Sequence, residues 1–263
     1  MLRQPTLFIP HGGGPCFFID DPHGIWTGME AFLRRLPTLL PERPRGIIIV
    51  SGHWETRGGF AFTGAPRPDL IYDYGGFPPH TYQLKYDAPG DTILAGRAAT
   101  LLHEAGLVAG VDPLRGLDHG VFVPLKVALP DADIPIVEMS VDRNFDPALH
   151  IAAGRALAPL RDEGILIIGA GMSFHNMRGY GNPRFTRPSE EFDAWLTQSA
   201  GMAAQARDQR LVAWENAPSA RLSHPREEHL LPLMVAAGAS EEPGEHIYSE
   251  HILETAISGF RFN

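Results

Sequence analysis

The chain has 263 residues, of which 44% are hydrophobic, and its formal net charge is −9. This acidic balance and the lack of a Lys/Arg cluster argue against a nucleic-acid partner. The single cysteine excludes a disulfide framework and a cysteine-based zinc site. No apolar run approaches the roughly 20 residues that a membrane helix needs, and the N-terminal segment is too short and too interrupted by proline for a signal peptide. We therefore expect a cytoplasmic protein with no membrane partner and one domain over residues 1–263.

Short aliphatic runs predict four β-strands. They occupy residues 6–10, 46–52, 134–140 and 165–171. Three of these runs are almost continuously apolar, which is typical of strands buried on both faces of a parallel sheet. Helical periodicity appears between them. It covers residues 28–40, 91–106 and 147–164. This alternation predicts an α/β fold with a central, mostly parallel sheet flanked by helices.

A late helix is predicted to begin near Pro225, because proline suits the first position of a helix. Ser223 or His224 would be its N-cap, and Glu227 and Glu228 would lie in its first turn, where negative charge is favourable.

The first predicted strand runs into His11, which is followed by three glycines, Pro15 and Cys16. A phosphate-binding loop of the Walker type would need lysine and a hydroxyl residue after its second glycine, so this loop does not match one. Pro15 would also remove an N–H group from any anion-binding nest. The glycines leave a metal-ligating role for His11 open, since they would let backbone, metal and substrate approach closely.

Histidines follow three of the four predicted strands. His11, His53 and His175 come after the first, second and fourth strands. Open α/β sheets bind ligands beyond the carboxyl ends of their strands, so we expect these rings to meet in one crevice. Imidazole suits zinc, iron, copper and nickel. His119 and His229 also stand in unusual sequence contexts. The remaining histidines are predicted to be ordinary surface residues: His23, His80, His103, His150, His246 and His251.

Seven segments in order resemble the class III extradiol ring-cleavage dioxygenases, in particular the DOPA 4,5-dioxygenase-like branch. The segments are HGGGP, SGHWET, DYGGFPPHTYQLKYDAPG, GLDHGVFVPL, DADIPIVEMSVD, FHNMRG and HPREEHLLPL. The resemblance implies that His11 and His53 bind a non-haem Fe(II) and that His229 is the third ligand. Glu227 and Glu228 remain alternatives to His229. Zinc is possible in the same site, with His175 as a possible fourth ligand.

The resemblance further implies cleavage of a catechol ring with O2, with L-DOPA as a candidate substrate and seco-DOPA as its 4,5-cleavage product. His175 would be the catalytic base and His119 a second acid/base. The neighbouring Asp118 is predicted either to orient the ring of His119 or to cap the helix that follows. Tyr72 and Phe77, in an aromatic loop, are candidate substrate-binding residues.

Two alternatives remain open from the residues alone. Three or four histidines on zinc could activate water in a hydrolase, or they could form a metal site without turnover. The physiological catechol is also open, and the protein could be a monomer or a small homo-oligomer.

Overall fold

The predicted strands form the middle of an eight-stranded sheet in the computed structural model, which describes residues 2–263. The strands lie side by side in the order β4-β3-β5-β2-β6-β1-β8-β7. Their bounds are β1 Thr6–Pro10, β2 Gly46–Thr56, β3 Phe60–Thr63, β4 Ala109–Asp112, β5 Ile136–Asp142, β6 Ile165–Gly171, β7 Gly244–Ile252 and β8 Thr255–Phe262. Strands β5, β2, β6 and β1 are parallel neighbours, and β3 is parallel to β4. The contacts β3–β5, β1–β8 and β7–β8 are antiparallel. The predicted α/β class with a mostly parallel sheet is confirmed.

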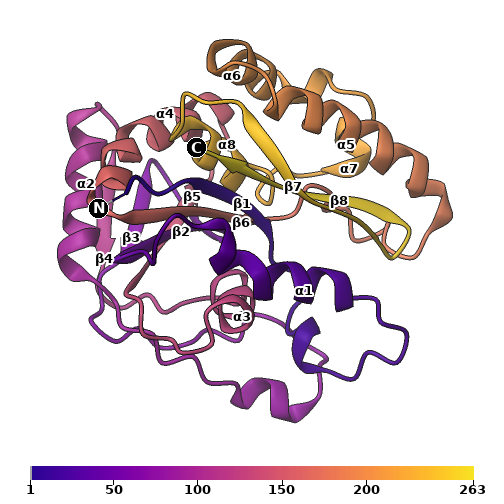
Figure 1. The fold of residues 1–263 in the computed structure, drawn as a ribbon, viewed down its shortest axis with the longest axis horizontal. Helices are drawn as coiled ribbons and strands as arrows, with labels where there is room; N and C mark the ends of the chain where they lie inside the picture. Colours follow the sequence, from indigo (N-terminus) through magenta and orange to yellow (C-terminus); the bar gives the residue numbers. More distant parts are fainter. Residues whose placement is uncertain (1) are drawn as a thin grey trace.

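Helices cover both faces of this sheet (Figure 1). Their bounds are α1 Thr27–Arg35, α2 Thr92–Glu104, α3 His119–Ala128, α4 Pro147–Leu157, α5 Thr186–Ala200, α6 Ala204–Val212, α7 Ala220–Ser223 and α8 Leu231–Gly238. Short 3-10 helices occupy Cys16–Phe18, Leu36–Leu39, Pro79–Gln83, Ala158–Glu163, Pro183–Phe185 and Trp214–Asn216. Within the described residues, no helix combines the length and the apolar composition needed to cross a bilayer.

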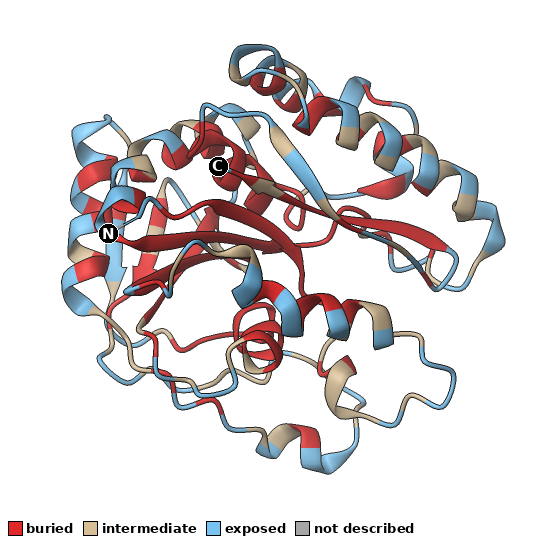
Figure 2. Cartoon of the chain, in the orientation of Figure 1, coloured by how far each residue is buried: buried red, intermediate tan, exposed pale blue. Residues whose placement is uncertain are grey.

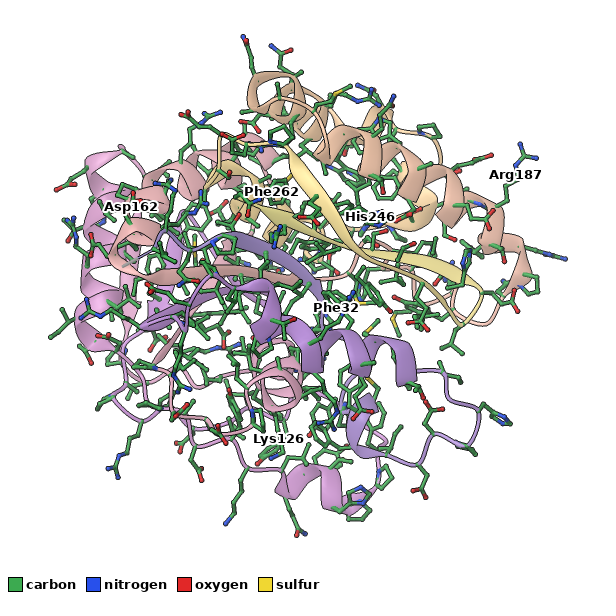
Figure 3. All side chains as sticks on the ribbon, in the orientation of Figure 1. Phe32, Lys126, Asp162, Arg187, His246 and Phe262 are labelled. Atoms are coloured by element: carbon green, nitrogen blue, oxygen red, sulfur yellow. The ribbon has the colours of Figure 1, made fainter. Side chains whose placement is uncertain are left out.

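The apolar strand runs arise because two hydrophobic cores share the sheet. In β2, Ile47 and Ile49 pack into the core under α1 and α3, whereas Ile48 and Val50 pack into the core under α2, α4, α5, α6 and α8. Successive strand side chains point to opposite faces, so a strand covered on both sides must be apolar throughout. Figure 2 shows the buried residues concentrated in these central strands. Arg187, at the start of α5, points away from the layers into solvent (Figure 3).

The carboxyl ends of the central parallel strands lie at one edge of the sheet. Pro10 of β1 pairs with Gly171 of β6, and Ala170 of β6 pairs with Ser51 of β2. The residues that leave these three strands therefore emerge next to one another, which is the arrangement that brings His11, His53 and the segment after β6 together.

The predicted start of the late helix is wrong. Helix α8 begins at Leu231, and residues 224–230 form a turn after the short helix α7. The turn docks on the strand ends: the backbone N–H of Met172 donates to the carbonyl of His229 over 3.1 Å. A Cβ atom on Gly52 would lie 2.6 Å from the carbonyl oxygen of Glu228, and one on Gly171 would meet that of His229. Bare backbone at these two positions lets the turn approach β2 and β6, and this contact overrides the local preference for helix.

The prediction that His150 is a surface residue is also wrong, because the structure buries its side chain completely. Its Nε2 accepts the backbone N–H of Asp142 over 3.1 Å, and its Nδ1 donates to the carbonyl of Asp146 over 2.7 Å. The ring thereby joins the end of β5 to the start of α4. The sequence predicted that His150 lies in a helix, but it did not show which side of that helix faces the sheet.

Candidate active site

Three histidines from distant parts of the chain meet beyond the carboxyl ends of the strands. His11 follows β1, His53 lies near the end of β2, and His229 comes from the turn before α8. Each offers a ring nitrogen, and these three atoms all lie within 4.8 Å of one another. The Nε2 atoms of His53 and His229 are 3.2 Å apart. This spacing suits nitrogen donors that surround a single ion.

The other nitrogen of each ring faces an oxygen acceptor. Nδ1 of His11 lies 2.8 Å from the carbonyl oxygen of Gly12, and Nδ1 of His229 lies 3.0 Å from Oε1 of Glu228. Nδ1 of His53 makes a longer approach, 3.5 Å, to Oδ2 of Asp73. When Nδ1 carries the proton and donates it to such an acceptor, Nε2 keeps its lone pair for a metal.

The strongest indication of a metal site is Nε2 of His11. His11 is 2% exposed, and this nitrogen is buried without a hydrogen-bond partner among residues 2–263. A buried polar atom left unpaired is costly, and most such atoms in folded proteins are paired. The atom points into a group of nitrogen donors, so a bound metal ion would satisfy it.

Burial keeps these rings neutral. Desolvation, together with the neighbouring histidines, lowers the pKa of His11 and of His229 well below the ordinary histidine value. The same causes lower the pKa of His53 to about 4. Neutral imidazole is the form that binds metal, so the site is ready for an ion at neutral pH.

Two more histidines stand beside this cluster, and both line the same cavity. The ring of His175 stacks on that of His229, with centroids 3.5 Å apart. The ring of His119 lies against that of His53, with centroids 4.0 Å apart. The structure therefore brings together all five histidines that the sequence singled out.

Two carboxylates connect these rings in pairs. Asp73 accepts from Nδ1 of His119 over 2.8 Å and also faces His53. Glu228 accepts from His229, and its Oε1 lies 3.4 Å from Nδ1 of His175. Burial raises the pKa of each carboxyl group, but the histidine contacts outweigh it. They lower the pKa of Asp73 to about 2 and hold that of Glu228 well below its ordinary range.

The predicted orientation of His119 by Asp118 is wrong, because Asp73 holds that ring. Asp118 instead caps α3, as the alternative prediction had it: its side chain accepts the backbone N–H of Gly120 over 3.0 Å. It also accepts from Ser51 and pairs with Arg115. Asp73 was missed because it lies 46 residues before His119. Its place in a loop dense with aromatic and glycine residues was the available signal.

The two glutamates before His229 play different parts. Glu227 forms an ion pair with Arg221, whereas Glu228 contacts the rings of His175 and His229. The group that includes both His11 and His53 contains His229 and neither glutamate.

A cavity of about 360 Å³ opens in front of these histidines. Its lining comprises Gly12, Gly13, Gly14, Trp26, His53, Asp73, Tyr74, Phe77, His119, Met172, His175, Met177, Tyr180 and Leu253. Phe77 is thus at the cavity. Tyr72 is not among the described lining residues, and its hydroxyl donates to the carbonyl of Leu84. Gly14 has a φ of +55°, and a Cβ there would lie 2.8 Å from the Phe77 ring, so this position needs glycine.

Comparison with known proteins identifies the family. The family model for the catalytic LigB subunit of aromatic ring-opening dioxygenase matches residues 5–260. The chain belongs to the LigB family. It is an extradiol aromatic ring-opening dioxygenase, as the sequence motifs predicted. LigB dioxygenases depend on a metal, and the histidine cluster is able to hold one.

Named relatives cover most of the chain. A protein named dioxygenase tasH from Hapsidospora irregularis is 42% identical over 260 residues, covering 92% of this chain and 80% of that protein. The 4,5-DOPA dioxygenase extradiol of Beta vulgaris is 37% identical over 248 residues, with 91% and 88% covered. Its namesake in Escherichia coli strain K12 is 35% identical over 246 residues, with 92% and 88% covered.

A solved structure shares the fold. The crystal structure of an uncharacterized protein from Escherichia coli K12 superposes with a TM-score of 0.78 at 28% sequence identity. The match covers 99% of this chain and 100% of that chain. The fold described above is therefore shared over almost the whole length of both molecules.

Proposed function

We propose that this LigB-family enzyme uses Fe(II) to cleave the ring of a catechol with O2. L-DOPA or a related catechol is the candidate substrate, because the names of several relatives include DOPA. The observation that carries the proposal is the buried, unpartnered Nε2 of His11, which lies among the donors of His53 and His229.

His11, His53 and His229 would hold the ion. Each has an Nδ1 directed at an oxygen and an Nε2 left for the metal, which is the arrangement that orients imidazole ligands. An Fe(II) ion held there would offer open coordination positions for the catechol oxygens and O2 and would supply electron transfer between them. The neutral state of the three rings leaves the full positive charge of the ion to favour the ionised catechol.

His175 is the proposed base for a catechol hydroxyl. It lines the cavity, stacks on His229, and approaches Glu228 through Nδ1. With Nδ1 directed at the carboxylate, Nε2 of His175 is the nitrogen available to take a proton. The carboxylate would then stabilise the imidazolium that forms.

His119 is the proposed second acid/base. Its Nδ1 donates to Asp73, whose carboxylate also accepts the backbone N–H of His119 over 3.0 Å. Two contacts to one carboxylate hold both the ring and the helix start, and they fix the tautomer that leaves Nε2 for substrate. Nε2 of His119 can therefore take a proton from the substrate and return it during the later steps of ring opening.

Zinc at the same site is the alternative to Fe(II), because an all-histidine donor set also suits zinc. A fourth-ligand role for His175 would favour this alternative, since it would close the position that O2 needs. The rings of His175 and His229 both contact Glu228. His175 is therefore close enough to the ligand cluster for either role, base or fourth ligand.

The experiment loads metal-free protein with Fe(II) under anaerobic conditions, and a parallel sample with zinc. Both are then given O2 and a panel of L-DOPA, caffeate and protocatechuate. We expect O2 uptake and a yellow ring-opened product with Fe(II) and neither with zinc. O2 uptake by the zinc sample but not by the iron sample, or by neither sample, would contradict the proposal.

The remaining sequence-based expectations stay predictions. They are a cytoplasmic location, the absence of nucleic-acid and membrane partners, and a monomeric or small homo-oligomeric state.

A further inference from the structure

The cavity in front of the histidines has two kinds of wall. Its polar side chains are His53, Asp73, His119 and His175, which belong to the proposed catalytic machinery. The rest of the lining is glycine, aliphatic or aromatic: Gly12, Gly13, Gly14, Trp26, Tyr74, Phe77, Met172, Met177, Tyr180 and Leu253. A ring held over the histidines would therefore extend its substituent along an apolar wall.

This wall offers no cationic side chain to a substrate carboxylate. No lysine or arginine lines the cavity within residues 2–263. The hydroxyls of Tyr74 and Tyr180 donate to the backbone carbonyls of Thr81 and Phe174, over 2.6 and 2.7 Å. Arg178 is exposed and lies outside the lining. A buried carboxylate without a charged partner is strongly unfavourable.

The wall is equally unsuited to a substrate ammonium group. Asp73 is the one acidic side chain in the described lining. Its Oδ1 already accepts from the backbone and ring of His119, and its Oδ2 faces His53. An ammonium group that took this carboxylate would compete with the contacts that hold both histidines. The carboxylate and the ammonium group of an amino-acid substrate would therefore both lack a charged partner in this cavity.

The mouth of the cavity is apolar as well. Met177 is 73% exposed and Leu253 is 36% exposed, and both line the entrance. Large apolar side chains exposed at the rim of a concave site are typical of a surface that a ligand covers. Methionine adapts its shape to different apolar partners. The volume of about 360 Å³ lies in the range of pockets that hold drug-sized ligands, so there is room for more than a ring.

We propose that the preferred substrate is an uncharged catechol with an apolar substituent, rather than an amino-acid or carboxylate catechol. This inference rests on the proposed function and, within its catechol class, ranks L-DOPA below an uncharged catechol. The substituent lies between Tyr74, Phe77 and Tyr180 and reaches Met177 and Leu253 at the mouth.

The experiment measures kcat/KM for O2 uptake by the Fe(II)-loaded enzyme on four matched catechols. They are 4-propylcatechol, 3-(3,4-dihydroxyphenyl)propionate, 3-(3,4-dihydroxyphenyl)propylamine and L-DOPA. They share the ring and a three-carbon substituent and differ in charge. We expect 4-propylcatechol to exceed every charged analogue by at least about tenfold, since one or more charges would be buried unpaired. Lengthening the chain to pentyl should raise kcat/KM further, by up to about fourfold per buried methylene.

The outcomes separate this inference from the function on which it rests. If the charged analogues are cleaved as well as 4-propylcatechol or better, ring cleavage stands and the inference is overturned. The backbone N–H groups of the 12–14 glycines would then be the donors to examine. If no catechol is cleaved, the proposed function fails and the inference fails with it.

A charge placed at the mouth gives a second, independent test. Met177→Lys adds a cation where the substituent is expected to pass, and Met177→Gln is the uncharged control of similar length. We expect the lysine variant to raise the kcat/KM of the propionate relative to 4-propylcatechol by at least about tenfold over the glutamine variant. Equal ratios in the two variants would show that the substituent does not approach Met177 and would overturn the placement.

Discussion

His11 and His150 are buried histidines in two different regions of the molecule, and they differ in how their ring nitrogens are used. At the carboxyl ends of the strands, His11 has Nδ1 at the carbonyl of Gly12 and Nε2 without a partner among the described residues. Between β5 and α4, His150 has both nitrogens in hydrogen bonds, to Asp142 and Asp146. Burial lowers the pKa of both residues, that of His150 to about 4.

This comparison shows that burial and a lowered pKa do not identify a functional histidine. A ring whose two nitrogens are both satisfied is a structural connector, and its neutral state follows from that role. A ring that leaves one nitrogen unpaired, close to the nitrogens of other histidine rings, indicates a metal site. The following predictions test this distinction, beginning with the largest effect.

The largest effect is expected for His11→Ala, which removes the unpaired nitrogen itself. The variant should fold but lose stoichiometric Fe(II) binding, and ring cleavage should fall to background, because the ion loses one of three proposed ligands. Metal analysis after anaerobic loading and O2 uptake measure the two losses. His150→Gln is the matched control and should keep its iron. Full iron content in His11→Ala would end the metal role of His11.

His175→Ala should retain most of the iron and lose ring cleavage. A missing general base lowers the rate by about 10²–10⁴-fold. The measurement compares iron content with turnover in the same preparation. Complete loss of iron would instead make His175 a fourth ligand, and normal turnover would place the base elsewhere.

Replacing the carboxylates that hold the rings should lower activity and metal affinity less than replacing the rings themselves. Asp73→Asn and Glu228→Gln keep the shape but remove the charge that supports two histidines each. Changes in groups that orient metal ligands typically cost about 10–100-fold in metal affinity or activity, and we expect that range here. Asp69→Asn, at an exposed position in the same loop, is the control. Wild-type kcat/KM and iron affinity in Asp73→Asn would count against its proposed role.

The smallest effect on activity is expected for His150→Gln, which should leave turnover unchanged and reduce stability by about 1–3 kcal/mol through lost buried hydrogen bonds.

The pH dependence of stability should also change in this variant. With a folded pKa of about 4 and an unfolded pKa near 6.5, the unfolded state binds the proton first. His150 therefore makes the protein less stable as pH falls from about 6.5 through about 4, by up to about 1.4 kcal/mol per pH unit.

Denaturant melts across this pH range should show a shallower acid loss of stability in His150→Gln than in the parent. The exposed His23→Gln variant is the control and should keep the parental slope. An unchanged slope in His150→Gln would mean that the ring titrates normally and that its hydrogen bonds do not hold it neutral.

Local patterns predicted the centre of the fold and much of the site. The runs that became β1, β2, β5 and β6 are apolar because both faces of each strand are covered, and this property is visible within a few residues. The proximity of His11, His53 and His175 followed from parallel topology, since each comes after a strand whose carboxyl end shares one edge. The order of seven motifs indicated the family that the comparisons confirmed.

Contacts between distant segments settled the rest, and no local pattern encodes them. Asp73, rather than the adjacent Asp118, holds His119 because the segment between β3 and α2 lies against the start of α3. Glycines at positions 52 and 171 admit the turn that carries Glu228 and His229, so the helix expected at Pro225 begins only at Leu231. The side of α4 that faces β5 decided that His150 is buried. A residue's type and spacing are properties of its own segment, whereas its hydrogen-bond partner depends on which other segment packs against it.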